Sequence, residues 1–119
     1  MSSIRLTEIE LPEFGVPETR PEFDEKHYAE RRERLRERAR AAGLATIIVY
    51  ADREHFANMA YLIDFEPRFE EALLVLSGDG AATILTGPEN AGRAAAARIE
   101  AEVITYPPFG LLGQDRSRT

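Results

Sequence analysis

The sequence predicts a single α/β domain built around a mixed sheet, and three observations support this. A long helical segment precedes a continuous β-branched run, which is typical of a strand covered on both faces. Two further β-rich runs are joined by a short Gly-Asp-Gly connection, which indicates an antiparallel hairpin. A later Ala-rich segment leads to a final strand. We therefore expect a mixed sheet, mostly parallel at its centre, with one antiparallel hairpin and flanking helices.

Composition limits the classes of protein to consider. The chain has 119 residues, which fits one domain of ordinary size, and its 44% apolar and 30% charged residues are typical of a globular protein. It has no cysteine, which excludes disulfides, thiolate metal sites and cysteine nucleophiles. The net charge of −6 argues against nucleic acid or an anionic membrane as a partner.

The hydropathy pattern bears on localisation. No apolar run approaches the ~20 residues needed to span a bilayer, and the N-terminus lacks the apolar core of a secretory signal. We therefore expect a cytoplasmic protein with no membrane partner.

Residues 1–23 are predicted to form an extended N-terminal arm. They contain five acidic residues and three prolines with little periodicity. The apolar side chains of Ile4, Leu6, Ile9 and Leu11 are available to pack on a neighbouring surface, such as that of a second subunit. The simpler alternative is a partly ordered leader.

The segment from Asp24 to Ala42 is predicted to be a helix. Asp24 is a suitable N-cap and Gly43 a suitable residue to follow the C-terminus. Six arginines between positions 31 and 40 form a basic cluster, but Glu33 and Glu37 interrupt it and no aromatic residue accompanies it. A solvated helix face is therefore favoured over a nucleic-acid-binding one.

The remaining elements follow from local patterns. The run 44–50 is predicted to be the central strand, and Asp52 is expected to cap a second helix that includes Phe56 and Met59. Residues 72–77 and 81–86 form the predicted hairpin, 91–100 a helix and 101–106 the last strand, which Pro107 and Pro108 end.

Motifs for catalysis are missing from the sequence. The two histidines, His27 and His55, lie far apart and outside any HExxH pattern. Ser77 is not part of a GxSxG elbow, and neither GxGxxG nor GxxxxGK[ST] occurs. We therefore expect no catalytic residue and no metal ligand in this chain.

The loop from Asp64 to Glu70 is the strongest candidate for binding, because it presents Phe65, Arg68 and Phe69 between a helix and a buried strand. Two interpretations are open. Both rings pack on the core while Arg68 pairs with Glu70 or Glu71, or Arg68 is free to bind a carboxylate, which its planar guanidinium matches with two hydrogen bonds.

Several motifs together carry a family resemblance over residues 24–118. In order, they are Tyr28-Ala29-Glu30-Arg31-Arg32-Glu33-Arg34-Leu35, Ala42-Gly43-Leu44-Ala45, Asn58-Met59-Ala60-Tyr61-Leu62 with Phe65, the aliphatic hairpin, and Thr86-Gly87-Pro88-Glu89-Asn90. Their order and spacing resemble the N-terminal domain of the creatinase/prolidase/aminopeptidase P family, which includes Xaa-Pro peptidases.

The resemblance implies a domain organisation. Residues 24–112 would form an α/β unit with ribonuclease H-like topology, and 113–119 would begin a linker to a C-terminal pita-bread catalytic domain. In the peptidases of this family, that second domain supplies Asp, Asp, His, Glu and Glu ligands to two divalent metals, usually Mn or Co. Creatinase itself uses the same fold without metal.

The resemblance also implies a homodimer in which the N-terminal domain covers the active site of the partner subunit. Phe65 would be a wall and Arg68 a carboxylate contact, within a loop that also holds Asp64 and Phe69. Many relatives have Thr-Gly where this chain has Ile63-Asp64.

The expected function is therefore that of a non-catalytic domain of an Xaa-Pro aminopeptidase or dipeptidase acting on a peptide or small amide. Two alternatives stay open at this stage. One is a free-standing α/β protein-interaction or dimerisation module. The other is the N-terminal domain of a guanidine-compound (creatine-type) hydrolase.

Overall fold

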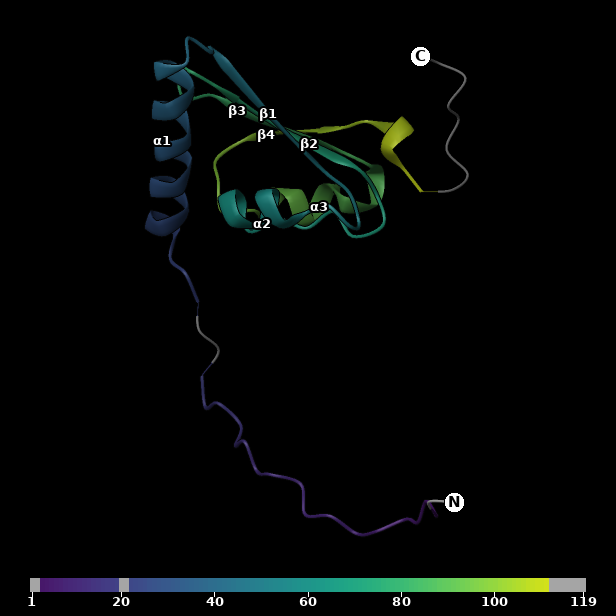
Figure 1. The fold of residues 1–119 in the computed structure, drawn as a ribbon. Helices are drawn as coiled ribbons and strands as arrows, with labels where there is room; N and C mark the ends of the chain where they lie inside the picture. The colour runs from purple at the N-terminus through teal and green to yellow at the C-terminus, as the bar shows by residue number, and fades with distance from the viewer. Residues whose placement is uncertain (1–2, 20–21, 112–119) are drawn as a thin grey trace.

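The fold is seen in a computed structural model that describes residues 3–19 and 22–111 (Figure 1). Its elements in chain order are α1 (Glu25–Ala41), β1 (Thr46–Ala51), α2 (Ala57–Ile63), β2 (Ala72–Ser77), β3 (Ala82–Thr86), the 3-10 turn η1 (Pro88–Asn90), α3 (Ala91–Ala95), β4 (Glu102–Thr105) and the 3-10 turn η2 (Pro107–Phe109). The four strands form one sheet in the order β1-β2-β3-β4. The predicted α/β domain with a mixed sheet and flanking helices is confirmed.

Strand pairing confirms the hairpin and corrects the centre of the sheet. β2 and β3 are antiparallel, with Leu74 opposite Ile84, but β1 also pairs antiparallel with β2. Among the described strands only β3 and β4 run parallel, so the expectation of a mostly parallel centre was wrong.

The strand at 46–51 is an edge strand rather than the central one that the sequence predicted. Its residues alternate in exposure: Ile47 and Val49 are half-buried, whereas Ile48 is 63% and Tyr50 45% exposed. β-branched residues favour a strand, but they do not reveal whether both faces are covered. The prediction failed because the outward side chains are apolar as well.

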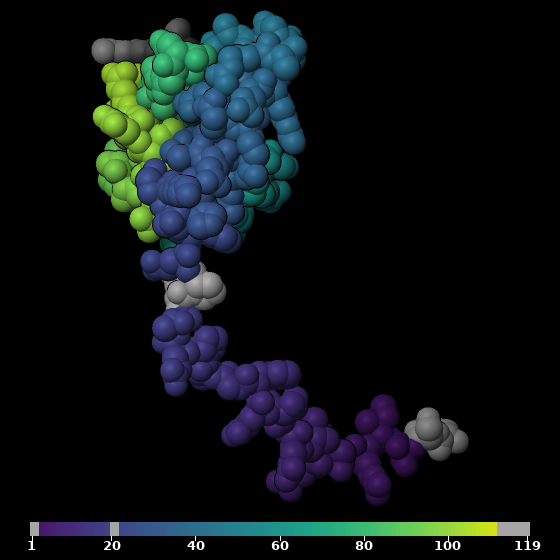
Figure 2. All heavy atoms as spheres, turned by 90° about the vertical axis from the view of Figure 1, so that its left-hand side faces the viewer, coloured from purple at the N-terminus to yellow at the C-terminus, as the bar shows by residue number. Residues whose placement is uncertain are grey.

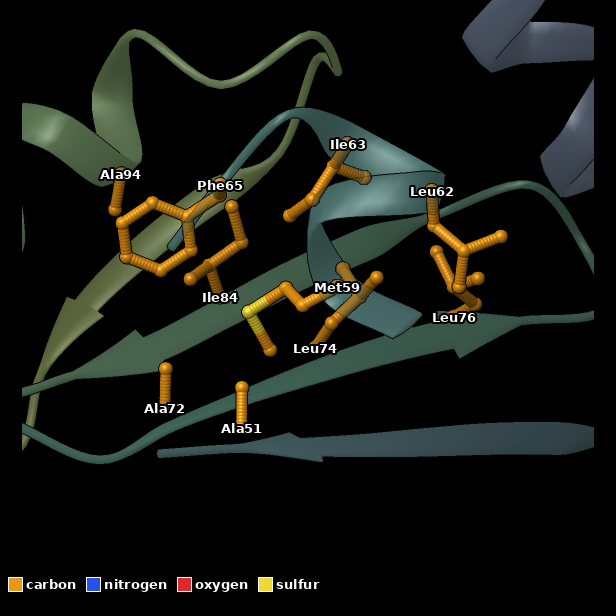
Figure 3. Packing of buried hydrophobic residues seen from close by; sticks show 10 residues of the cluster. All are labelled: Ala51, Met59, Leu62, Ile63, Phe65, Ala72, Leu74, Leu76, Ile84 and Ala94. Carbon is orange, nitrogen blue, oxygen red and sulfur yellow. The ribbon is translucent and has the colours of Figure 1, made fainter. Parts of the chain in front are cut away.

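One face of the sheet carries the core. Burial alternates along β2, so that Ala72, Leu74 and Leu76 point inward. Figure 3 shows Met59 and Ile63 of α2 packed with Phe65 against Leu74 and Ile84 on this face, while Leu62 lies over Leu76. In the described part of the chain, no helix packs on the opposite face.

Helix α1 begins and ends where the sequence predicted. The backbone N–H of His27 donates to the Asp24 carboxylate at 3.0 Å, and Gly43 has φ +74. An unexpected feature is the burial of Arg32, whose guanidinium donates to the carbonyl oxygens of Leu62 (3.0 Å) and Arg98 (2.6 Å). Arg32 therefore ties α1 to the end of α2 and to the segment before β4.

Two other helical predictions need correction. Asp52 does not cap α2, which begins five residues later, but closes a turn by accepting from the backbone N–H groups of Glu54 and His55. The helix predicted over 91–100 is shorter, since α3 ends at Ala95. Its predicted helicity rested on alanine content, and Ala94 is its one buried residue.

The described part of the arm, residues 3–19 and 22–23, contains no helix or strand, and residues 3–19 extend away from the rest of the molecule (Figures 1 and 2). All the large apolar side chains of residues 3–19 are more than 70% exposed, whereas Phe23 is 54% exposed. Residues 113–119, predicted to begin a linker, lie outside the described residues. None of the described helices is both long and apolar enough to cross a membrane.

Candidate functional site

The candidate loop joins α2 to β2 and begins at Asp64. This residue has φ 55 and ψ 38, and its backbone N–H donates to the Ala60 carbonyl at 3.0 Å, which ends the helix. Aspartate tolerates the left-handed conformation better than most residues, although glycine favours it more. Ile63-Asp64 therefore still permits a left-handed helix end. The Asp64 carboxylate also lies 3.8 Å from the guanidinium of Arg98.

Phe65 lies inside the molecule. Its side chain is only 2% exposed and packs in the cluster beside Ile84 and Ala94 (Figure 3). The resemblance implied that Phe65 is an exposed wall of the substrate site, and this is wrong. Phe65 instead anchors the start of the loop to the hydrophobic core.

A buried carboxylate holds the far end of the loop. Glu70 is 1% exposed and accepts hydrogen bonds from the backbone N–H groups of Glu89 (3.2 Å) and Asn90 (3.0 Å) and from the Asn90 side chain (2.9 Å). The same Asn90 amide also donates to the Pro67 carbonyl at 2.5 Å. These contacts fix the loop to the turn after β3, a feature that we call the Glu70 clamp.

The clamp requires glycine at position 87. A Cβ atom on Gly87 would lie 2.3–2.5 Å from the carboxylate atoms of Glu70. Cβ atoms do not approach non-bonded atoms this closely, so a side chain at position 87 would displace the Glu70 carboxylate from the turn.

Arg68 and Phe69 form the exposed tip of the loop. Arg68 has φ 55 and is exposed, and within residues 3–19 and 22–111 no hydrogen bond or ion pair reaches its guanidinium. The two carboxylates considered as its partners are used elsewhere: Glu70 is in the clamp, and Glu71 accepts from the Tyr50 hydroxyl at 3.2 Å. Phe69 is 56% exposed.

The structure adds Arg53 to the site, a residue that the sequence did not indicate. Its guanidinium carbon lies 5.8 Å from the centroid of the Phe69 ring, within the range of a cation–π contact. Arg53, Glu66, Arg68 and Phe69 line a hollow of about 150 Å³. The turn closed by Asp52 places Arg53 here. In the sequence, Asp52 followed by the polar residues 53–55 was the one sign that a turn, rather than a helix, begins at this point.

Comparison with known families agrees with this architecture. The family model of the creatinase/prolidase N-terminal domain matches residues 31–115, which include all four strands and the whole loop. The chain belongs to this family. Comparison with curated proteins gives no match.

In this creatinase/prolidase N-terminal domain, charged groups surround the base of the site. A hydrogen bond and ion pair with His55, together with backbone N–H groups, lower the pKa of Asp52 to about 2. In turn, the Asp52 carboxylate raises the pKa of His55. Loss of solvent around its hydroxyl, followed by the hydrogen bond to Glu71, raises the pKa of Tyr50 to about 12. At neutral pH, the ionised Asp52 carboxylate holds the turn that carries Arg53 through its hydrogen bonds to the backbone.

The side chains at the loop tip have the chemistry to bind an anionic group. Two guanidinium groups beside an exposed phenyl ring can hold a carboxylate and an adjacent apolar group. In the described portion of the chain, no group of three or more His, Asp or Glu side chains is placed to hold a metal ion.

Proposed function

We propose that this domain is the non-catalytic N-terminal domain of a creatinase/prolidase-type hydrolase, and that its loop contacts substrate in the active site of a partner subunit. In the homodimer, Arg68 and Phe69 project toward a catalytic domain that supplies the chemistry. The observation that carries this proposal is the unpaired guanidinium of Arg68 at the tip of a clamped loop. The backbone that carries Arg68 is anchored, and its planar guanidinium can bind a carboxylate through two hydrogen bonds.

The shape of the loop supports a fixed role for Arg68. Phe65 and Glu70 are both buried on either side of it, so the backbone between them is held at two points. A loop whose backbone is already ordered loses less conformational entropy when a ligand binds to it. The loop therefore suits recognition better than a mobile segment of the same composition would.

The proposed substrate is a peptide or small amide that carries a carboxylate, with an Xaa-Pro peptide as the first choice. A creatine-type guanidine compound also carries a carboxylate, so Arg68 would serve either chemistry. The two divalent metals of a peptidase, Mn or Co, would belong to the catalytic domain, and we assign no residue of this chain to them.

The decisive experiment replaces Arg68 in the protein that joins this domain to its catalytic domain. A hydrogen bond to a charged group contributes about 1.5–3 kcal/mol, so Arg68→Ala should lower kcat/KM by about 10- to 100-fold for a substrate with a free carboxylate. The C-terminal amide of the same substrate should be hydrolysed equally well by both proteins. Arg93→Ala, which removes another exposed arginine, is the matched control.

Two outcomes would contradict the proposal. Equal losses for Arg68→Ala and Arg93→Ala would mean that Arg68 does not recognise the carboxylate. The isolated domain should also hydrolyse no Xaa-Pro dipeptide when supplied with Mn²⁺ or Co²⁺. Hydrolysis that a chelator abolishes would place catalysis in this chain.

A further inference from the structure

A second hollow lies along the free edge of the sheet. It has a volume of about 630 Å³ between α1, α2 and β1. Apolar side chains that include Leu35, Ile48 and Tyr50 line it together with the arginines of α1. We call this feature the edge groove.

Backbone groups on the outer side of β1 are available at the edge groove. β1 is the first strand of the sheet and pairs with β2 alone among the described strands. A free strand edge of this kind accepts another extended segment by main-chain hydrogen bonding. The edge groove therefore suits a β-strand rather than a helix or a small molecule.

Unpaired positive charge marks one side of the groove. Arg34 and Arg38 line it, and in the described residues neither side chain has a hydrogen bond or ion pair. The neighbouring arginines are engaged: Arg32 is buried, Arg36 donates to the Gly80 carbonyl at 3.1 Å, and Arg40 pairs with Glu33 at 2.6 Å. The groove therefore favours a strand with acidic side chains on one face.

The N-terminal arm contains a segment of this chemistry. Residues 8–11 read Glu-Ile-Glu-Leu, so an extended backbone places both glutamates on one face and Ile9 and Leu11 on the other. Ile9 is 72% and Leu11 80% exposed. Beside β1, the glutamates would meet Arg34 and Arg38 while the apolar pair would extend the sheet face of Ile48 and Tyr50.

We propose that residues 8–11 of one copy add a strand to β1 of a second copy, so that two chains exchange their arms. Two features favour the second copy over the chain's own groove. Pro12 and Pro17 lie between this segment and α1 and disfavour a close reversal of the backbone. A two-fold dimer also fills both grooves with identical contacts.

Charge reversal tests the proposed exchange of arms, with the dimerisation of each variant measured by analytical ultracentrifugation. One variant carries Glu8→Arg and Glu10→Arg, and the other carries Arg34→Glu and Arg38→Glu. Each places like charges together in its own homodimer, so each should dimerise about tenfold or more weakly than the natural chain. Mixed together, the two variants should form a heterodimer, because both arms then meet a groove of opposite charge.

Phe14→Asp with Val16→Asp is the matched control, because it adds acid to the arm outside the pairing segment and should leave the dimer intact. A natural chain that stays monomeric at millimolar concentration overturns the proposal. This includes a monomer in which hydrogen exchange shows that the arm is protected, because the arm would then occupy the groove of its own chain. Charge-reversed variants that dimerise normally, or that fail to associate when mixed, also overturn it.

Discussion

At the residue scale, the loop owes its shape to Glu70, which places two neighbouring carboxylates in different environments. Glu70 is buried and accepts three hydrogen bonds from the turn after β3, whereas the exposed Glu71 accepts one from Tyr50. The sequence offered both as partners of Arg68, because nothing local distinguishes them. The donors to Glu70 lie about twenty residues later, so only the folded hairpin reveals the difference.

Replacing the buried acceptor should destabilise the domain. Glu70→Gln keeps the size of the side chain but turns one acceptor oxygen toward donors as an NH₂ group, and an unsatisfied buried group costs about 1–3 kcal/mol. Denaturant unfolding should show a loss of this size. Glu71→Gln makes the same chemical change at an exposed site and should stay within about 0.5 kcal/mol of the natural protein.

The turn that carries Arg53 should respond to pH at both of its charged groups. The folded state lowers the pKa of Asp52 to about 2, so its contribution to stability is present above about pH 4 and is lost as the pH falls toward 2. The pKa of His55 is raised, so its contribution is present below about pH 6.5 and is lost as the pH rises through the folded value.

A titration of the His55 ring protons by NMR measures this coupling. Asp52→Asn removes the carboxylate and should lower the pKa of His55 toward its ordinary value. Asp79→Asn makes the same change at the hairpin turn and should leave the His55 titration where it was. A pKa that does not move with Asp52→Asn would show that the ion pair does not form in solution.

At the element scale, prediction succeeded where the signal was local. The cap at Asp24, the positive φ at Gly43 and the Gly-Asp-Gly hairpin are set by neighbouring residues, and all three are found in the structure. The position of β1 at the edge depends on which strand and helix lie beside it, so its composition alone could not predict it. The burial of Phe65 and the exposure of Phe69 have the same origin, since both follow from how the loop packs.

The junction between β3 and η1 should tolerate no side chain at its glycine. Gly87→Ala places a methyl group against the Glu70 carboxylate and should cost about 1–3 kcal/mol of unfolding free energy through overpacking. Gly92→Ala is the matched control, because a Cβ there meets no atom within 4 Å and the residue lies in α3. This second variant should be neutral or more stable by up to about 1 kcal/mol. Equal effects of the two would mean that the clamp yields easily.

At the scale of the whole molecule, the chain is far more extended than a compact domain. Its Cα radius of gyration is 20.5 Å, against about 13–14 Å for a compact domain of this length. The arm accounts for this, and its apolar side chains are left in solvent. The apolar residues of the arm can be read from the sequence, but the groove that we propose receives them is formed by three separate elements.

Removing the arm separates folding from association. Deletion of residues 1–19 should leave the helical signal in far-ultraviolet circular dichroism unchanged, because residues 3–19 contain no helix. If the arms hold a dimer together, the thermal midpoint of the natural chain rises with protein concentration, whereas that of the truncated chain does not. A midpoint independent of concentration in both would contradict exchange of the arms.

The Glu70 clamp also dictates when the binding loop can acquire its shape during folding. Glu70 comes just before β2, and its partners follow β3, so the hairpin must close before the carboxylate can reach the turn. Until that step, the backbone around Arg68 is an ordinary flexible chain with no reason to hold its left-handed turn. Slow hydrogen exchange at the backbone amides of Glu89 and Asn90, which donate to Glu70, would therefore indicate that the loop around Arg68 has reached its folded conformation.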